Sequence, residues 1–254
     1  NTGKNICSLC GSLDYAFLIE ANGVDTAQDR LFSVVKCKTC GLVYLNTEVA
    51  KEDLKAFDYK EFHGNTAAFL KRFQSFLVNM FMLFRVKKIE RMRKAGIILD
   101  VGCGNGLFLK KMRERLWDCY GTDISQYAID LAGKHGGIKL FCGEMEDAKF
   151  SDSQFDVITF WQSFEHIAKP SQILQKARSL LNDDGILFIS VPNIESIEAV
   201  MSMKKWFGFE PPFHLYWYSA RTLALLLEKN GFHVIKIGKN SIEYNFPFFM
   251  QSFF

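Results

Sequence analysis

The 254-residue sequence lacks several features that would narrow its function at once. It has no block of basic residues: 31 Lys and Arg against 28 Asp and Glu leave a net charge of +3, so no nucleic-acid-binding tail is indicated. No apolar run is long enough for a membrane span, which needs about 20 residues. No signal peptide is recognisable, although the chain does not begin with Met, and no internal repeat is visible.

The seven cysteines are an odd number, which argues against a framework of disulfide bonds. Four of them form two C-x-x-C pairs, a spacing that binds metal in reducing compartments, so we expect a cytoplasmic protein. With 48% hydrophobic and 23% charged residues, the composition is that of a packed globular protein. The length suits one α/β domain with a small accessory module.

The patterns along the chain predict three parts. Residues 1–46 hold both cysteine pairs and short β-type runs, and form a small β zinc ribbon. Residues 47–95 turn helical, with an apolar stripe that is expected to pack on the main domain; lipid contact is the alternative. The stripe consists of Phe69, Phe73, Phe76, Met80 and Phe84. Residues 96–254 alternate apolar runs with helical stretches, which predicts a Rossmann-like, mostly parallel sheet with helices on both faces. The expected strands are 97–101, 119–122, 139–142, 155–160, 186–191 and 233–237.

The cysteine pairs predict one structural zinc ion on Cys7, Cys10, Cys37 and Cys40. Each pair can grip the ion from a tight turn, and four thiolates suit tetrahedral Zn²⁺. A glycine follows each pair, as expected for turns that need positive φ. With no open coordination position, such an ion supports folding and does no chemistry.

The segment LDVGCGNG, residues 99–106, predicts a ligand-binding turn between a strand and a helix. Its glycines at 102, 104 and 106 allow the backbone to turn sharply and to approach a ligand closely. Leu107 stands where a nicotinamide or flavin fingerprint needs its third glycine, which disfavours a dinucleotide. Asp123, in GTDIS at the end of the next strand, is placed to accept both hydroxyls of an adenosyl ribose.

Together with FCGEMEDAKFSDSQFDVITFW and LLNDDGILFISVPN, these motifs resemble the ordered set of class I S-adenosylmethionine-dependent methyltransferases, over about residues 97 to 240. The resemblance implies S-adenosylmethionine as cofactor, with the methionine part beside Asp100 and Gly102 and the ribose on Asp123. It also implies adenine contacts from Glu144 and Met145. The full set of cofactor residues expected from this resemblance is Asp100, Gly102, Gly104, Gly106, Asp123, Ile124, Glu144, Met145 and Trp161, the last near the sulfonium.

Two further stretches carry resemblances. CKTCGLVYLN, residues 37–46, is similar to the start of a bacterial methyltransferase group that carries such a ribbon and modifies sugars, lipids or small metabolites. WQSFEHI, residues 161–167, resembles both the W-H-x-L-E-H motif of ribbon-bearing methyltransferases and the E-x-x-E-H motif of ubiquinone-pathway O-methyltransferases. In the second motif, acidic residues and His can hold a divalent ion. Gln162 stands where these patterns place His or Glu, which argues against a catalytic magnesium.

His166 and His214 are the candidate general bases, because both follow carboxyl ends of strands, where open α/β sheets bind ligands. The alternative is that each is a hydrogen-bonded structural residue. The aromatic stretch Trp206 to Tyr218 predicts a lid over the acceptor, or else a crossover loop buried against the Phe73 to Phe84 helix.

The sequence therefore predicts S-adenosylmethionine-dependent methyl transfer, to an oxygen of a small molecule, sugar or lipid-linked acceptor. An RNA methyltransferase that uses the ribbon for RNA binding is a second reading, but the modest net charge argues against nucleic acid as partner. A third is a binding protein with a degenerate pocket. A transmembrane span is not expected, and peripheral membrane contact stays open.

Overall fold

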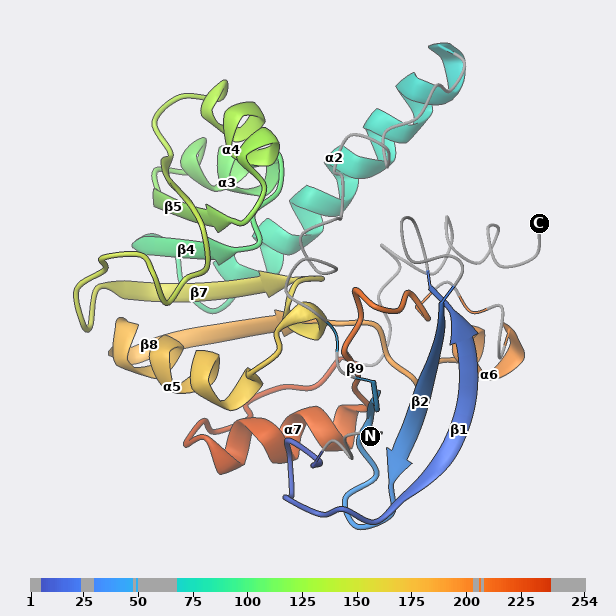
Figure 1. Ribbon diagram of the computed structural model, residues 1–254. Helices are drawn as coiled ribbons and strands as arrows, with labels where there is room; N and C mark the ends of the chain where they lie inside the picture. Colours follow the sequence, from blue (N-terminus) through green and yellow to red (C-terminus); the bar gives the residue numbers. More distant parts are fainter. Residues whose placement is uncertain are drawn as a thin grey trace. The chain divides into compact units, whose positions relative to one another are not determined.

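The computed structural model describes residues 6–23, 30–47, 49, 68–202, 206 and 208–238. The chain divides into two compact units, each made of separate segments (Figure 1). The cysteine unit comprises Asn1–Phe57, Phe164–Gln175 and Val191–Phe254. The glycine-loop unit comprises Asp58–Ser163 and Lys176–Ser190. The boundaries at residues 46 and 95 that the sequence suggests stay predictions.

The glycine-loop unit is built on a five-stranded sheet with the order β6-β5-β4-β7-β8. Every neighbouring pair is parallel, which confirms the predicted parallel sheet. The central strands are buried along nearly their whole length, as expected for parallel strands covered by helices. The strands are β4 (Ile97–Val101), β5 (Asp118–Asp123), β6 (Lys139–Cys142), β7 (Phe155–Trp161) and β8 (Leu181–Ser190).

The helices of this region connect the strands and help to bury them. Helix α3 packs on β5, and α4 packs on β5 and β6. The core of the unit joins Val86 and Ile89 of α2 to Ile98, Leu109 and Trp161. The helices of this unit are α2 (Ala68–Glu90), α3 (Leu107–Arg113) and α4 (Gln126–Gly133); α5 (Pro170–Leu180) is divided between the two units, and the short 3₁₀ helix η3 (Phe164–His166) belongs to the cysteine unit.

Helix α2 confirms the predicted helical segment and corrects its buried face. The expected stripe ends at Phe84, but that side chain is 43% exposed, whereas Val86 and Ile89 are fully buried. Positions 82, 86 and 89 lie three and four residues apart, so they share a helix face that is rotated from the predicted one. The side chains of Phe69, Phe73 and Phe76 lie outside the described part of the structure.

The cysteine unit is built on a four-stranded antiparallel sheet with the order β1-β2-β3-β9. Strand β3 comes from the start of the chain and β9 from near its end, and they join through the pairs Val43 with Trp217 and Tyr44 with Tyr216. Phe32, Val34 and Trp217 lie in its hydrophobic core. Its strands and helices are β1 (Tyr15–Asn22), β2 (Leu31–Cys37), β3 (Val43–Leu45), β9 (Tyr216–Trp217), α6 (Ile197–Ser202) and α7 (Ala220–Lys229).

One expectation for the last part of the chain is wrong, and another stays a prediction. The aromatic stretch predicted as a lid supplies core residues, because Trp206, Phe213 and Trp217 are buried and Trp206 and Trp217 belong to the hydrophobic core of the cysteine unit. The indole N–H of Trp217 also finds a buried acceptor, the carbonyl of Gly208. Residues 233–237, predicted as a strand, are described without strand pairing.

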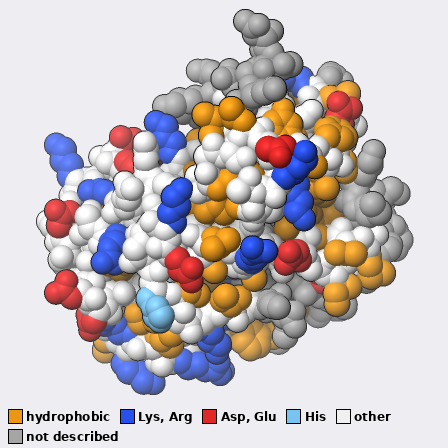
Figure 2. All heavy atoms as spheres, turned by 90° about the horizontal axis from the view of Figure 1, so that it is seen from below, with side chains coloured by type: hydrophobic (Ala, Val, Ile, Leu, Met, Phe, Trp, Pro, Cys, Tyr) orange, Lys and Arg blue, Asp and Glu red, His pale blue; other side chains and the backbone are white. Residues whose placement is uncertain are grey.

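The length and apolar character of the described helices bear on membrane spanning, and one face shows how charged side chains are distributed. Among the described residues, no helix combines the length and the apolar character that crossing a membrane requires. On the face shown in Figure 2, Lys and Arg side chains stand among acidic and hydrophobic ones. This distribution agrees with the small net charge of the sequence.

Candidate functional site

The glycine loop after β4 has the sharp turn that the sequence predicts. Gly102, Gly104 and Gly106 have φ values of +74°, +53° and +72°, a region that side chains other than glycine disfavour. A Cβ on Gly102 would lie 2.5 Å from Cβ of Ser163, so the loop also needs glycine for space. The backbone N–H groups of Gly102 and Cys103 both donate to the carbonyl of Thr122, which fixes the loop against β5.

Asp123, at the end of β5, is joined directly to this loop. Its Oδ2 accepts from the N–H of Gly104 at 2.9 Å, and its Oδ1 accepts from the N–H of Ser125 at 2.9 Å. Burial raises the pKa of Asp123, while these two backbone N–H groups lower it. Because a carboxylate oxygen has two lone-pair directions, each oxygen retains acceptor capacity for a ligand hydroxyl.

Asp100, near the end of β4, is a buried carboxyl with a side-chain donor. It is 3% exposed, and its Oδ1 accepts a 2.6 Å hydrogen bond from the hydroxyl of Thr159 on β7. Burial raises the pKa of Asp100 to about 7, and Asp123 adds to that rise. Thr159 and Arg85 act in the opposite direction, since both favour the charged form.

The adenine-side residues lie on the loop after β6. The N–H of Gly143 donates to the carbonyl of Asp123, which brings this loop next to the predicted ribose position. Met145 is buried, whereas Glu144 is exposed. Ile124 is 58% exposed and follows Asp123 directly. The structure thus brings the predicted cofactor residues to one edge of the sheet, and their contacts with S-adenosylmethionine stay predictions.

Trp161, at the end of β7, is a core residue with cations over its ring. It packs edge-on against Phe108 at a centroid distance of 5.6 Å. The guanidinium carbon of Arg85 lies 4.9 Å from its ring centroid, and the ammonium of Lys88 lies 5.9 Å away. A contact between Trp161 and a sulfonium therefore stays a prediction, and it would share the ring with these two cations.

Sequence reasoning missed three residues of this edge: Arg85, Thr159 and Ser163. The hydroxyl of Ser163 donates to the carbonyl of Val101 at 2.6 Å, which holds the turn after β7 against the glycine loop. Gln162, next to it, has a positive φ of 56°, and strain of this kind gathers at functional sites. For Arg85 and Thr159, the one signal in the sequence is that each is a polar residue within an apolar helix or strand.

The four predicted zinc ligands meet at one end of the antiparallel sheet. Sγ of Cys7 lies 3.5 Å from Sγ of Cys40, and Sγ of Cys10 lies 3.5 Å from Sγ of Cys37. All four belong to a group whose ligand atoms lie within 4.8 Å of one another, and none forms a disulfide. Four sulfurs at the usual Zn–S length of about 2.3 Å would be about 3.8 Å apart, so the cluster fits zinc.

The two turns that carry these cysteines have the expected knuckle form. Gly11 and Gly41 have φ values of +77° and +86°, and their N–H groups donate to the carbonyls of Cys7 and Cys37. Burial would raise the pKa of Cys37, but backbone N–H groups and neighbouring thiols outweigh it and lower the pKa to about 6. Burial raises the pKa of Cys7 and of Cys40, so in the absence of metal Cys37 is shifted toward the thiolate that metals bind and these two thiols are shifted away from it.

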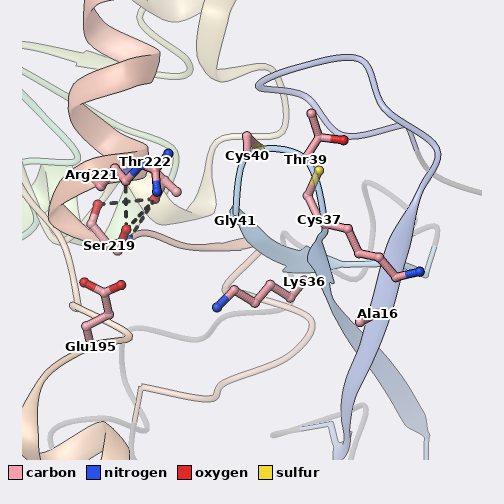
Figure 3. A pocket seen from close by; sticks show the side chains of 11 residues that line it. Ala16, Lys36, Cys37, Thr39, Cys40, Gly41, Glu195, Ser219, Arg221 and Thr222 are labelled. Atoms are coloured by element: carbon pink, nitrogen blue, oxygen red, sulfur yellow. Dashed lines mark hydrogen bonds between the residues drawn. The ribbon is translucent and has the colours of Figure 1, made fainter.

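A cavity of about 370 Å³ lies beside the second knuckle, within the cysteine unit. Figure 3 shows the side chain of Lys36 extending toward the side on which Glu195 lies, near the Ser219 and Thr222 hydrogen bonds that cap α7. Both basic side chains and a carboxylate line this cavity, so it favours neither an anionic nor a cationic ligand. None of the predicted cofactor residues contributes to its walls.

The two predicted catalytic histidines lie together in the cysteine unit, with Glu165. The rings of His166 and His214 are 4.8 Å apart between centroids. Burial lowers the pKa of both imidazoles, that of His214 to about 3. Burial also raises the pKa of Glu165 to about 8, against a smaller lowering by its own backbone N–H. No contact tests whether either histidine acts as a base, so that role stays a prediction.

Comparison with known proteins identifies the family. A family model described as a methyltransferase domain matches residues 68–237. The ubiquinone biosynthesis O-methyltransferase of Actinobacillus pleuropneumoniae is 33% identical over 114 residues, which are 41% of this chain and 48% of that protein. The mitochondrial enzyme of the same name from Saccharomyces cerevisiae is 35% identical over 111 residues, 39% of this chain and 35% of that protein. The chain thus spans less than half the length of these two relatives.

Solved structures support the fold. A SAM-dependent methyltransferase from Archaeoglobus fulgidus superposes with a TM-score of 0.55 at 24% identity, over 70% of this chain and 76% of that one. A possible histamine N-methyltransferase from Thermotoga maritima gives a TM-score of 0.53 at 22% identity, over 65% and 79%. At these identities the likeness shows the fold alone.

Proposed function

The chain belongs to the methyltransferase domain family, and from that premise we propose that it transfers the methyl group of S-adenosylmethionine to an oxygen of a small-molecule acceptor. The observation that carries this proposal is the hydrogen bond between the N–H of Gly104 and Oδ2 of Asp123. It joins the glycine loop to the strand-end carboxylate, as one adenosyl-binding edge requires.

The residues of this edge divide the work of holding the cofactor. Asp123 would accept the ribose hydroxyls with the lone pairs left free by Gly104 and Ser125. Asp100, when ionised, would attract the ammonium of the methionine part, and the glycine turn leaves room for its chain. S-adenosylmethionine itself supplies a methyl group on a good leaving group, so positioning accounts for most of the catalysis.

The choice of oxygen and of a small acceptor rests on the curated relatives, whose name is ubiquinone biosynthesis O-methyltransferase. A sugar or lipid-linked acceptor belongs to the same proposal. The absence of a basic block in the sequence supports a small acceptor over RNA. For the cysteine cluster we propose a structural Zn²⁺ ion, on the sulfur spacing and knuckle geometry described above.

The test is isotope transfer from labelled S-adenosylmethionine, with fractionated cell extract and total RNA as separate acceptors. Label in the low-molecular-mass fraction, identified as a methyl ether or ester by NMR, is the expected result. Label in the RNA fraction would show that the acceptor is RNA and not a small molecule. No transfer and no binding of S-adenosylmethionine by calorimetry would overturn the function.

A further inference from the structure

We propose that Thr159 is a positioning residue of the cofactor site, whose hydroxyl holds the carboxylate of Asp100 ready for the ammonium of the methionine part. This role rests on the function proposed above, because it takes S-adenosylmethionine as the ligand of this edge. Thr159 would not touch the cofactor and would act through Asp100. Its place in the sheet, its hydrogen bond and the charges around Asp100 support the role.

The register of the sheet brings Thr159 to Asp100. The two residues are paired directly across β7 and β4, so their side chains lie on the same face of the sheet. On the other side of β4, Gly121 of β5 is paired with Asp100, and a Cβ there would lie 2.8 Å from a methyl carbon of Leu109. Of the two strands beside β4, only β7 can therefore offer Asp100 a side-chain partner.

The surroundings of this pair are apolar. Ile98 on β4, with Val157 and Trp161 on β7, stands two positions away and hence on the same face, and all three belong to the hydrophobic core. Thr159 itself is fully buried. A buried hydroxyl costs free energy unless it is hydrogen-bonded, and valine has nearly the same shape without that cost. The hydrogen bond of this threonine therefore explains its presence better than packing does.

The hydrogen bond is suited to holding a negative charge. The hydroxyl of Thr159 donates to Oδ1 of Asp100 at 2.6 Å, a length typical of a hydroxyl on a carboxylate, whereas the carbonyl of Leu99 lies 3.4 Å away. The branched Cβ of threonine restricts its rotamers, which fixes the position of the hydroxyl oxygen. The bond engages one carboxylate oxygen, so the other keeps acceptor capacity for an ammonium.

The groups around Asp100 divide into those that oppose its ionisation and those that favour it. Burial raises the pKa of Asp100 to about 7, and the charge of Asp123 adds to the rise. The hydroxyl on β7 lowers this pKa, and Arg85 of α2 lowers it less. The thiols of Cys103 and Cys119 also interact with Asp100, but burial raises the pKa of both, so they stay neutral. Without the hydroxyl, Asp100 would be protonated over more of the neutral range.

Calorimetry with two ligands tests this role. S-adenosylhomocysteine, the demethylated product, carries the amino-acid part, whereas 5′-methylthioadenosine keeps the adenosine and lacks that part. Thr159→Val should bind the first ligand about tenfold more weakly than the parent at pH 6 and nearly equally at pH 9, as expected for a rise of about one unit in the pKa of Asp100. Comparison at the same pH cancels the titration of the ligand itself.

Three controls separate a role through Asp100 from a general loss of structure. Binding of 5′-methylthioadenosine by Thr159→Val should match the parent at both pH values. Thr159→Ser, which keeps the hydroxyl, should behave as the parent does. In an Asp100→Asn background, Thr159→Val should cause no further loss of S-adenosylhomocysteine affinity, because the residue through which it acts has already lost its charge.

A measurement without ligand makes the outcome independent of cofactor binding. In urea denaturation, the free energy of unfolding of the parent should fall as pH rises and level off near the pKa of Asp100, at about pH 7. In Thr159→Val the levelling should move up by about one pH unit. An unmoved profile, equal weakening of both ligands, or the same loss at every pH would overturn the role of Thr159 alone. Failure of both ligands to bind the parent would overturn the proposed function, and this role with it.

Discussion

The two units build their sites by different means. In the glycine-loop unit, the backbone forms most of the candidate site, through the positive φ of Gly102 and the N–H of Gly104. In the cysteine unit, side chains form the candidate sites: thiols make up one group, and imidazoles with a carboxylate make up another. A site formed by backbone atoms depends on close approach of the chain, so adding a side-chain atom at a glycine should disrupt it. A site formed by metal-binding side chains depends on the bound ion, so removing one of those side chains should disrupt it.

The largest effect is expected on the side-chain site. Replacing Cys37 and Cys40 together by Ser should remove one zinc ion and much of the stability of the cysteine unit, since structural zinc contributes on the order of 10 kcal/mol in small modules. Elemental analysis measures the zinc, and the near-ultraviolet dichroism of the whole chain, to which the buried Trp206 and Trp217 contribute, reports the loss of packing. Binding of S-adenosylmethionine, in the other unit, should persist. Cys142→Ser, an exposed cysteine outside the cluster, is the control; equal zinc in both proteins contradicts the assignment.

The next effect tests the backbone site. Gly102→Ala should destabilise the protein by about 2–5 kcal/mol, because it combines a strained positive φ with a clash against Ser163. Gly136→Ala is the matched control: its φ is +65°, but its Cβ would meet nothing within 4 Å. Urea denaturation should therefore show a clearly smaller loss for position 136. Equal losses would mean that strain alone, and not close packing, requires the glycine.

A smaller effect concerns the ligand of the backbone site. Asp123→Ala should weaken S-adenosylmethionine binding by about 2–3 kcal/mol, the range for charged hydrogen bonds. Calorimetry measures it, and Asp130→Ala on α4 controls for loss of an acidic residue on an exposed helix face. Unchanged affinity in folded Asp123→Ala would remove this residue from the cofactor site.

The smallest expected effect is the pH dependence of the free energy of unfolding of the glycine-loop unit. The pKa of Asp100 is raised to about 7 in the folded state, so unfolding releases its proton and stability falls as pH rises toward 7. Between pH 6 and pH 8 this contributes a loss of about 1 kcal/mol. Asp100→Asn should remove that slope in denaturation curves. Thr159, Arg85 and Asp123 face this carboxyl, but Thr159 does not ionise and Arg85 keeps its proton in this range, so an unchanged slope would mean that a group other than Asp100 sets it.

The sequence correctly predicted the features that depend on residues close together in the chain. The glycine loop, the strand-end position of Asp123 and both cysteine knuckles could be predicted because a few neighbouring residues determine each turn. Five of the six expected strands are present, and the sheet is parallel as predicted.

Long-range packing explains what the sequence did not show. Trp217 is part of the hydrophobic core because β9 pairs with β3, a partner far away in the chain, so the stretch expected to be a lid is buried. The contact between His214 and the Glu165 helix has the same cause, since the N–H of Leu215 donates to the carbonyl of Glu165. The predicted buried face of α2 was wrong because each residue along a helix turns the side-chain direction by about 100°, so an error of one or two positions selects a different face.

The pairing of β3 with β9 also orders events during synthesis on the ribosome. The glycine-loop unit lies between residues 58 and 190, so nearly all of it emerges before Trp217 is translated. The first three antiparallel strands must wait, with Phe32 and Val34 lacking the ring that later covers them. The nascent cysteine unit therefore passes through an interval in which its apolar face is open to chaperones and to misassociation, whereas the parallel sheet can close early.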